Sequence, residues 1–132
     1  MWTVITNNSY VYEKFKDDLN VVYLDDGSYM EVLYKVRDKV HEGFKLLTHP
    51  LAGSIKPNQT PYRSVVLQEQ KQGLDFYSLQ LVENSISSAE KFLKMKALPK
   101  WSDKTLGDFK TIDLSLVSGA VANKFINKIQ IY

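Results

Sequence analysis

The sequence contains no cysteine. Disulfide bonds, thiolate-bound metals, iron–sulfur clusters and a cysteine nucleophile are therefore all excluded. The absence also fits the reducing cytoplasm, where we expect the protein to reside. Only two histidines are present, and their spacing matches no zinc-binding pattern, so we expect neither a metal nor another cofactor.

Long apolar runs are also missing. The first ten residues, MWTVITNNSY, turn polar after about five positions and lack a basic start, which predicts neither a signal peptide nor a membrane span. The 17 basic and 15 acidic residues leave a formal net charge of +2, too small to indicate nucleic acid or an anionic membrane as a partner. With 44% apolar residues, the chain is long enough for one core, and we expect a single domain over 1–132.

Apolar residues follow strand spacing and helix spacing by turns in the first half of the chain, whereas the second half is mostly helical. The predicted elements are strands at 2–6, 20–24, 44–47 and 64–68 and helices at 9–17, 29–42, 75–96 and 112–126. Consecutive strands joined through helices are parallel. We therefore expect a small three-layer α/β domain with a mostly parallel four-stranded sheet of order 2-1-3. The position and orientation of the fourth strand are left open, and an antiparallel fourth strand is an alternative because the loop 48–63 holds no helix for a crossover.

Two polar segments follow predicted strands. Thr6, Asn7 and Asn8 come after the first strand, and Thr48 and His49 come after the third. Ligands bind open parallel sheets outside the carboxyl ends of the strands, at a switch point in the strand order. In the order 2-1-3 the two segments are neighbours, so we expect them to form a ligand-binding crevice.

The loop 48–63 supplies chemistry for an anion. Gly53 and Ser54 can turn backbone N–H groups toward it, and Lys56 and Arg63 can neutralise its charge. We therefore expect a small carboxylate or phosphate compound as the ligand, while a solvated polar loop is the alternative explanation. The expected ligand-binding residues are Thr6, Asn7, Asn8, Thr48, His49, Gly53, Ser54, Lys56 and Arg63.

Common catalytic motifs are absent. The sequence has no GxGxxG, GxxxxGK[ST] or GxSxG pattern. Ser54 has no base near it in the sequence except His49, and no third group orients that base, so we do not expect nucleophilic catalysis. A non-catalytic protein is favoured; in an enzyme, His49 would be the general acid/base.

Four stretches resemble the GrdX family. They are LLTHPLAGSIKPNQTPYRSVV at 46–66, VITNN at 4–8, ENS and AEKFL within 83–93, and DF and IDLSL within 108–116. The first is the most specific, because it holds the long pattern THPL-x-GS-x-KP-x-x-TPY. The resemblance implies a small protein encoded beside glycine, sarcosine or betaine reductase components in amino-acid-fermenting anaerobes, and it carries over no catalytic residues.

Three hypotheses follow. The first is an accessory or regulatory protein of the glycine/betaine reductase system, which binds a small anionic ligand or a reductase component through 6–8 and 48–63. The second is a small enzyme that acts on an acyl-phosphate or amino-acid derivative, with His49 as general acid/base. The third is an interaction protein that uses the lysine-rich segment 91–104 or an apolar patch. A homo-oligomer is compatible with each of them.

Overall fold

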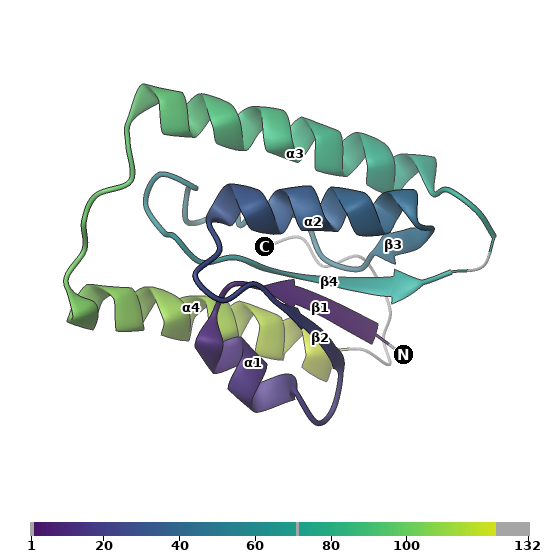
Figure 1. The fold of residues 1–132 in the computed structure, drawn as a ribbon, viewed down its shortest axis with the longest axis horizontal. Helices are drawn as coiled ribbons and strands as arrows, with labels where there is room; N and C mark the ends of the chain where they lie inside the picture. The colour runs from purple at the N-terminus through teal and green to yellow at the C-terminus, as the bar shows by residue number, and fades with distance from the viewer. Residues whose placement is uncertain (1, 71, 124–132) are drawn as a thin grey trace.

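A four-stranded sheet lies between two layers of helices (Figure 1) in the computed structural model, which describes residues 2–70 and 72–123. The strands are β1 Trp2–Thr6, β2 Asn20–Tyr23, β3 Phe44–Leu46 and β4 Ser64–Glu69, and the helices are α1 Ser9–Phe15, α2 Tyr29–His41, α3 Phe76–Met95 and α4 Asp103–Ala122. Helices α2 and α3 cover one face of the sheet, and α1 and α4 cover the other. The predicted three-layer α/β architecture is confirmed.

The sheet is mixed, so the prediction of a mostly parallel sheet is wrong. Its order is β2-β1-β4-β3, in which β1 and β2 are parallel and β4 is antiparallel to both β1 and β3. The predicted order 2-1-3 placed β1 beside β3, but β4 lies between them. The reason is the connection between β3 and β4: residues 47–63 contain no helix, and a parallel return would need a crossover that is usually helical.

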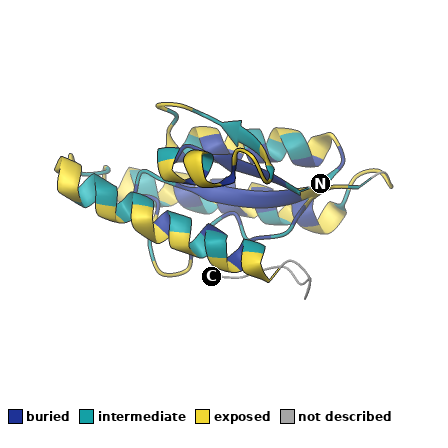
Figure 2. Ribbon diagram, turned by 90° about the horizontal axis from the view of Figure 1, so that it is seen from below, coloured by how far each residue is buried: buried dark blue, intermediate teal, exposed yellow. Residues whose placement is uncertain are grey.

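The core is divided by the sheet, because successive side chains of a strand point to opposite faces. Ile5 and Val65 are buried on the side of α2 and α3, whereas Val4 and Val66 are buried on the side of α1 and α4. Figure 2 shows strands in dark blue at the centre of the fold, and β1 and β4 are the deeply buried strands, whereas β2 is only half-buried and the helices are buried along one side only. Both faces are thus covered, and the ends of the strands are where side chains reach the surface.

Each helix begins at a polar side chain that accepts a hydrogen bond from the first turn. The N-cap residues are Asn8, Ser28, Asp75 and Ser102. At Ser28 the side chains of Ser28 and Glu31 form a capping box. No helix in the described ranges is both long and apolar enough for a membrane span.

Helix α4 begins nine residues before its predicted start at 112, directly after Ser102. The residues from Asp103 to Thr111 hold few apolar side chains, chiefly Leu106 and Phe109, so they lack the apolar stripe that predicts a helix. The predicted end at 126 lies outside the described residues. So does the segment 129–132, whose alternating sequence IQIY predicts a terminal strand or a fraying helix end. The first half of α4 is therefore an element that periodicity missed.

Candidate functional site

A buried polar junction joins the end of β1, the start of β4 and the middle of α4. Ser64 Oγ donates to Asp113 Oδ2 at 2.6 Å, and Asn8 Nδ2 donates to the same oxygen at 3.0 Å. Thr6 Oγ1 lies 2.6 Å from Ser64 Oγ and accepts from the backbone N–H of Asn8. Because the Ser64 proton goes to Asp113, the Thr6 hydroxyl donates to Ser64. This chain of bonds ties α4 to the sheet.

Asn7 holds three further segments together. Its Nδ2 donates to the carbonyl oxygens of Gly27 at 2.9 Å and Pro61 at 2.8 Å, and its Oδ1 accepts from the backbone N–H of Arg63 at 2.9 Å. Both amide protons and the oxygen are thus engaged. Asn7 positions the backbone at the carboxyl ends of β1 and β2 against the end of the loop.

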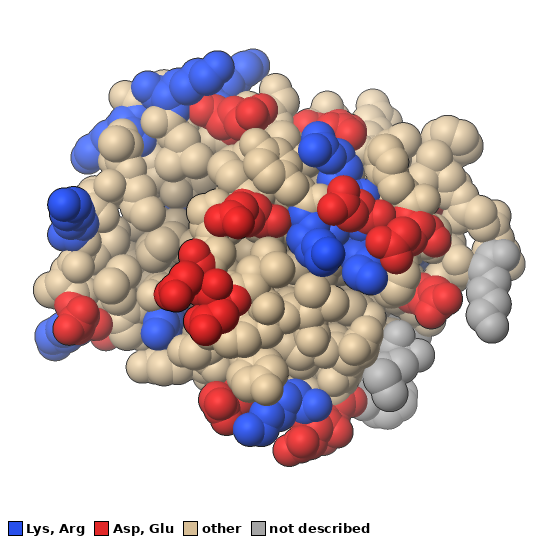
Figure 3. Space-filling view, in the orientation of Figure 1, with Lys and Arg blue, Asp and Glu red and all other residues tan. Residues whose placement is uncertain are grey.

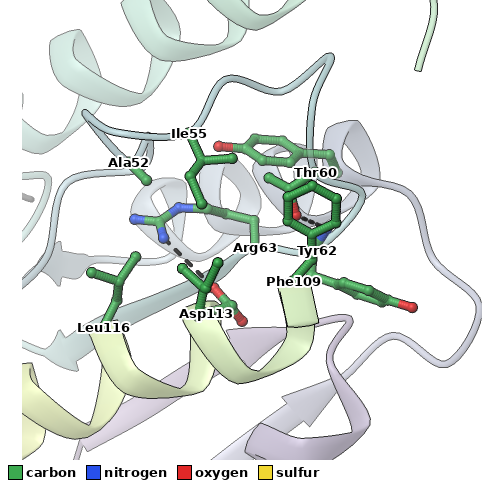
Figure 4. Close-up of a pocket in the computed structure, with 10 residues that line it drawn as sticks. Ala52, Ile55, Thr60, Tyr62, Arg63, Phe109, Asp113 and Leu116 are labelled. Atoms are coloured by element: carbon green, nitrogen blue, oxygen red, sulfur yellow. Dashed lines mark hydrogen bonds and ion pairs between the residues drawn. The ribbon is translucent and has the colours of Figure 1, made fainter. Parts of the chain in front are cut away.

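The Arg63 side chain is 1% exposed and faces internal partners. Its Nε donates to Pro50 O at 2.8 Å, its Nη2 donates to His49 O at 2.7 Å, and its Nη1 lies 3.7 Å from Asp113 Oδ1. Figure 4 shows the guanidinium and the carboxylate pointing toward one another from the two sides of a cavity. The residue expected to neutralise a ligand therefore has an internal carboxylate at its side.

Thr48 and His49 also make internal bonds. Thr48 Oγ1 accepts from Val66 N at 3.0 Å, and His49 Nδ1 accepts from Leu51 N at 2.9 Å. Burial, and then the charge of Arg63, lower the pKa of His49, so its ring is neutral near pH 7. With Nδ1 engaged as an acceptor, the neutral ring carries its proton on Nε2. It can donate a hydrogen bond from there, but it presents no free lone pair to act as a base.

The structure divides the nine predicted site residues into two groups. Thr6, Asn7, Asn8, Thr48, His49 and Arg63 meet at the buried junction. Gly53, Ser54 and Lys56 lie instead on an exposed turn of the loop. The gap between β1 and β3, where the crevice was expected, is filled by Ser64 and Arg63 at the start of β4.

The exposed turn borders an open cleft of about 510 Å³, which we call the 54–59 cleft. Residues Ser54 to Gln59 form one side, and the end of α3, the connection to α4 and Phe109 form the other. Asn58 Nδ2 donates to Phe92 O at 3.0 Å, and Trp101 Nε1 donates to Gln59 O at 2.8 Å, so hydrogen bonds tie the two sides together. These two bonds hold the turn 54–59 against the end of α3 and the connection to α4.

Only lysines carry charge among the described residues that line the 54–59 cleft. They are Lys56 and Lys96, and the Nζ of Lys56 lies 5.3 Å from the centre of the Phe92 ring. The lining also offers the hydroxyl of Ser54 and the amides of Asn58 and Gln59. The cleft thus combines positive charge with hydrogen-bond donors, which is the chemistry of an anion site.

A second hollow of about 300 Å³ lies at the carboxyl ends of β1 and β2. It holds charges of both signs, from Asp25 and Asp26 on one side and Lys110 on the other. The Tyr23 hydroxyl donates a hydrogen bond to Asp25 Oδ1 at 3.2 Å, and Lys110 Nζ lies 5.4 Å from the centre of the Tyr62 ring. Its two carboxylates make it less suited to an anion than the 54–59 cleft.

A small cavity of about 10 Å³, room for a single water, lies beside Arg63 (Figure 4). Neither Tyr29 Oη nor Asp113 Oδ1, both of which line it, has a hydrogen-bond partner among the described residues, although Asp113 Oδ1 is the oxygen near Arg63. Burial raises the pKa of Tyr29 to about 12. Ile55 and Phe109 line both this cavity and the 54–59 cleft, so they separate the buried ion pair from the open surface.

Sequence patterns missed two parts of the site. Asp113 is an isolated acidic residue in the apolar run IDLSL, and this polar interruption is the signal that could have found it. Lys96 was predicted only as part of the lysine-rich segment 91–104, and its place in the cleft was missed because it depends on α3 ending beside a turn that lies 40 positions earlier in the chain. In residues 2–70 and 72–123 no three histidine or acidic side chains converge as a metal site requires.

A family model described as GrdX, GrdX-like protein, covers residues 3–122. No curated protein sequence matched the chain, and no solved structure matched it either. The matched range includes the buried junction and all of the 54–59 cleft.

Proposed function

The chain belongs to the GrdX-like family, and we propose that it is a non-catalytic accessory protein that binds a small anionic ligand in the 54–59 cleft. The family name suggests an association with glycine reductase operons, which supports a role beside the reductase components in the cytoplasm. The absence of cysteine excludes a role that needs a cysteine thiol. The observation that carries the proposal is the presence of two lysines, and no acidic side chain, among the described residues lining the cleft.

The two lysines come from separate parts of the fold. Lys56 belongs to the turn after β3, and Lys96 is the C-cap residue of α3. Two ammonium groups that face one cleft repel each other, and an anion between them removes that repulsion. Because hydrogen bonds from Asn58 and Trp101 already hold the walls, little ordering is needed when a ligand binds.

The proposal keeps the loop 48–63 as the binding segment and gives its two ends different tasks. The buried junction at 6–8 and 48–50 positions the loop, and the outer turn 54–59 contacts the ligand. His49 enters no reaction in this proposal, because its Nδ1 lone pair is already used by Leu51. The expectation of a small anionic ligand is therefore retained, at a site displaced from the crevice beside β1.

A reductase component is a second candidate partner for the same surface. Figure 3 shows lysine and arginine side chains gathered over the C-terminal end of α3, at the upper left of the view. Lys91, Lys94 and Lys96 are the basic residues of that helix end. An acidic surface on a component protein would be attracted to them, and such an attraction weakens as salt is added.

Isothermal titration with inorganic phosphate, acetyl phosphate, glycine and betaine tests the proposal. We expect heat with at least one of the two phosphate compounds, a loss of that heat in Lys56→Met/Lys96→Met, and no change in Lys14→Met. Lys14 is the matched control, because it is an exposed lysine of α1 that lines neither the cleft nor the two smaller hollows. If neither phosphate compound gives heat, or if the control variant loses as much heat as the double variant, the proposal is overturned.

A further inference from the structure

One wall of the 54–59 cleft is built from aromatic side chains of three different segments. Phe92 comes from α3, Trp101 from the connection, and Phe109 from α4. The ring centroids of Trp101 and Phe109 lie 5.6 Å apart, and the two ring planes are tilted by 55°. All three side chains are only partly buried, so the cleft exposes ring surface as well as lysine charge.

The hydrogen bond from Trp101 Nε1 to Gln59 O fixes the indole in the wall of the cleft. The indole nitrogen is a donor only, so this bond satisfies its single polar group. What the ring can still offer a ligand is its apolar π-surface. Met95, which is 78% exposed, adds a polarisable and adaptable side chain to the lining.

The size of the cleft exceeds what a bare phosphate or acetate ion would fill. Its 510 Å³ falls within the roughly 300–1,000 Å³ that pockets for larger organic ligands occupy. A ligand that used only Lys56 and Lys96 would leave the aromatic wall in contact with water. The shape and the lining together therefore call for an apolar part on the anion.

We infer that the ligand of the 54–59 cleft is an anion that carries a flat ring, either a nucleobase or an aryl group joined to a phosphate or carboxylate. The ring lies against Trp101 and Phe109, and the acidic group reaches Lys56 and Lys96. This inference rests on the proposed anion site and adds the class of ligand. Stacking of a ring on an aromatic side chain accounts for about 5- to 150-fold in affinity.

Titration with matched probes tests this inference. Phenyl phosphate and AMP are compared with inorganic phosphate, and benzoate is compared with acetate. We expect each ring-bearing anion to bind at least about 5-fold more tightly than its ring-free counterpart, and adenosine to bind more weakly than AMP. A stronger preference within the phosphate pair or within the carboxylate pair identifies the acidic group.

Two substitutions assign the preference to the aromatic wall. Trp101→Leu removes both the ring and the bond to Gln59, and it should abolish the ring-dependent gain. Trp101→Phe restores a ring without the bond to Gln59 and should recover part of the gain. Phe76→Leu is the matched control, because Phe76 is an aromatic residue at the start of α3 that is 75% exposed and lies outside the cleft.

The outcomes separate the two proposals. If phosphate and phenyl phosphate bind equally well, the ring-bearing class is wrong although the anion site stands. If adenosine binds as well as AMP, the lysines are not part of the site and the anion proposal fails. If none of the anions binds, both proposals fail together.

Discussion

Replacing Asp113 with alanine is the most severe test of the buried junction. Asp113 is 4% exposed, and its carboxylate accepts hydrogen bonds from Ser64 and Asn8 and lies 3.7 Å from the Arg63 guanidinium. Removing it leaves the charge of Arg63 buried without that carboxylate, a change that typically costs about 3–5 kcal/mol. Native domains are stable by only about 5–15 kcal/mol, so we expect Asp113→Ala to lose a large part of the free energy of unfolding.

Urea unfolding followed by far-UV circular dichroism measures this loss. The control is Glu83→Ala, which breaks an ion pair of similar length, 3.6 Å to Arg37, on the exposed surface and should cost at most about 1 kcal/mol. The double variant Arg63→Met/Asp113→Leu should be less destabilised than the sum of its single changes by about 1 kcal/mol or more. A loss below about 1 kcal/mol in Asp113→Ala would refute the assignment of the junction as the element that holds α4.

Three further predictions concern single side chains. Ser28→Ala removes the capping box at the start of α2 and should lower the free energy of unfolding by about 1 kcal/mol, whereas Ser28→Asp, which can still cap, should not. Burial raises the pKa of Tyr29 to about 12. The stability that its neutral hydroxyl contributes is therefore complete below about pH 10 and is lost as the pH rises through about 12. Tyr29→Phe should lose less of its free energy of unfolding over that range. Burial and Arg63 lower the pKa of His49, so stability present above about pH 6.5 is lost as the pH falls through the lower folded value. His49→Asn should flatten that acid limb of a stability–pH curve, and an unchanged limb would show that protonation of His49 is not its cause.

Local signals predicted most elements of the first half. The strand at Trp2–Thr6 has the same bounds in the structure, because the asparagines after it end the strand and cap the next helix. The helix predicted from Tyr29 begins there as well, because the Ser28–Glu31 box is a pattern of adjacent residues. What such signals do not contain is the direction of a strand, since an apolar run such as 64–68 has the same pattern in a parallel and an antiparallel sheet.

The candidate site was predictable to a similar degree. The segments 6–8 and 48–49 were expected to be neighbours because they follow strands, and Arg63 links them by donating its backbone N–H to Asn7 Oδ1 and its Nη2 to His49 O. Their use in an internal network was not predictable, because it depends on Asp113, which α4 brings to Ser64 across 49 sequence positions. The cleft likewise depends on where α3 ends relative to Lys56, a fact of tertiary packing that local periodicity does not encode.

The position of β4 between β1 and β3 has a consequence for protein synthesis. While the ribosome has made only the first 63 residues, β1 can pair with β2 on one side, but its other edge has no strand to bond to. In the described chain β3 pairs with β4 alone, so it too must wait. The nascent chain therefore leaves unpaired the two strand edges that β4 covers, one on β1 and one on β3, until residues 64–69 emerge. The emergence of that segment from the ribosome sets the earliest time at which the sheet can close.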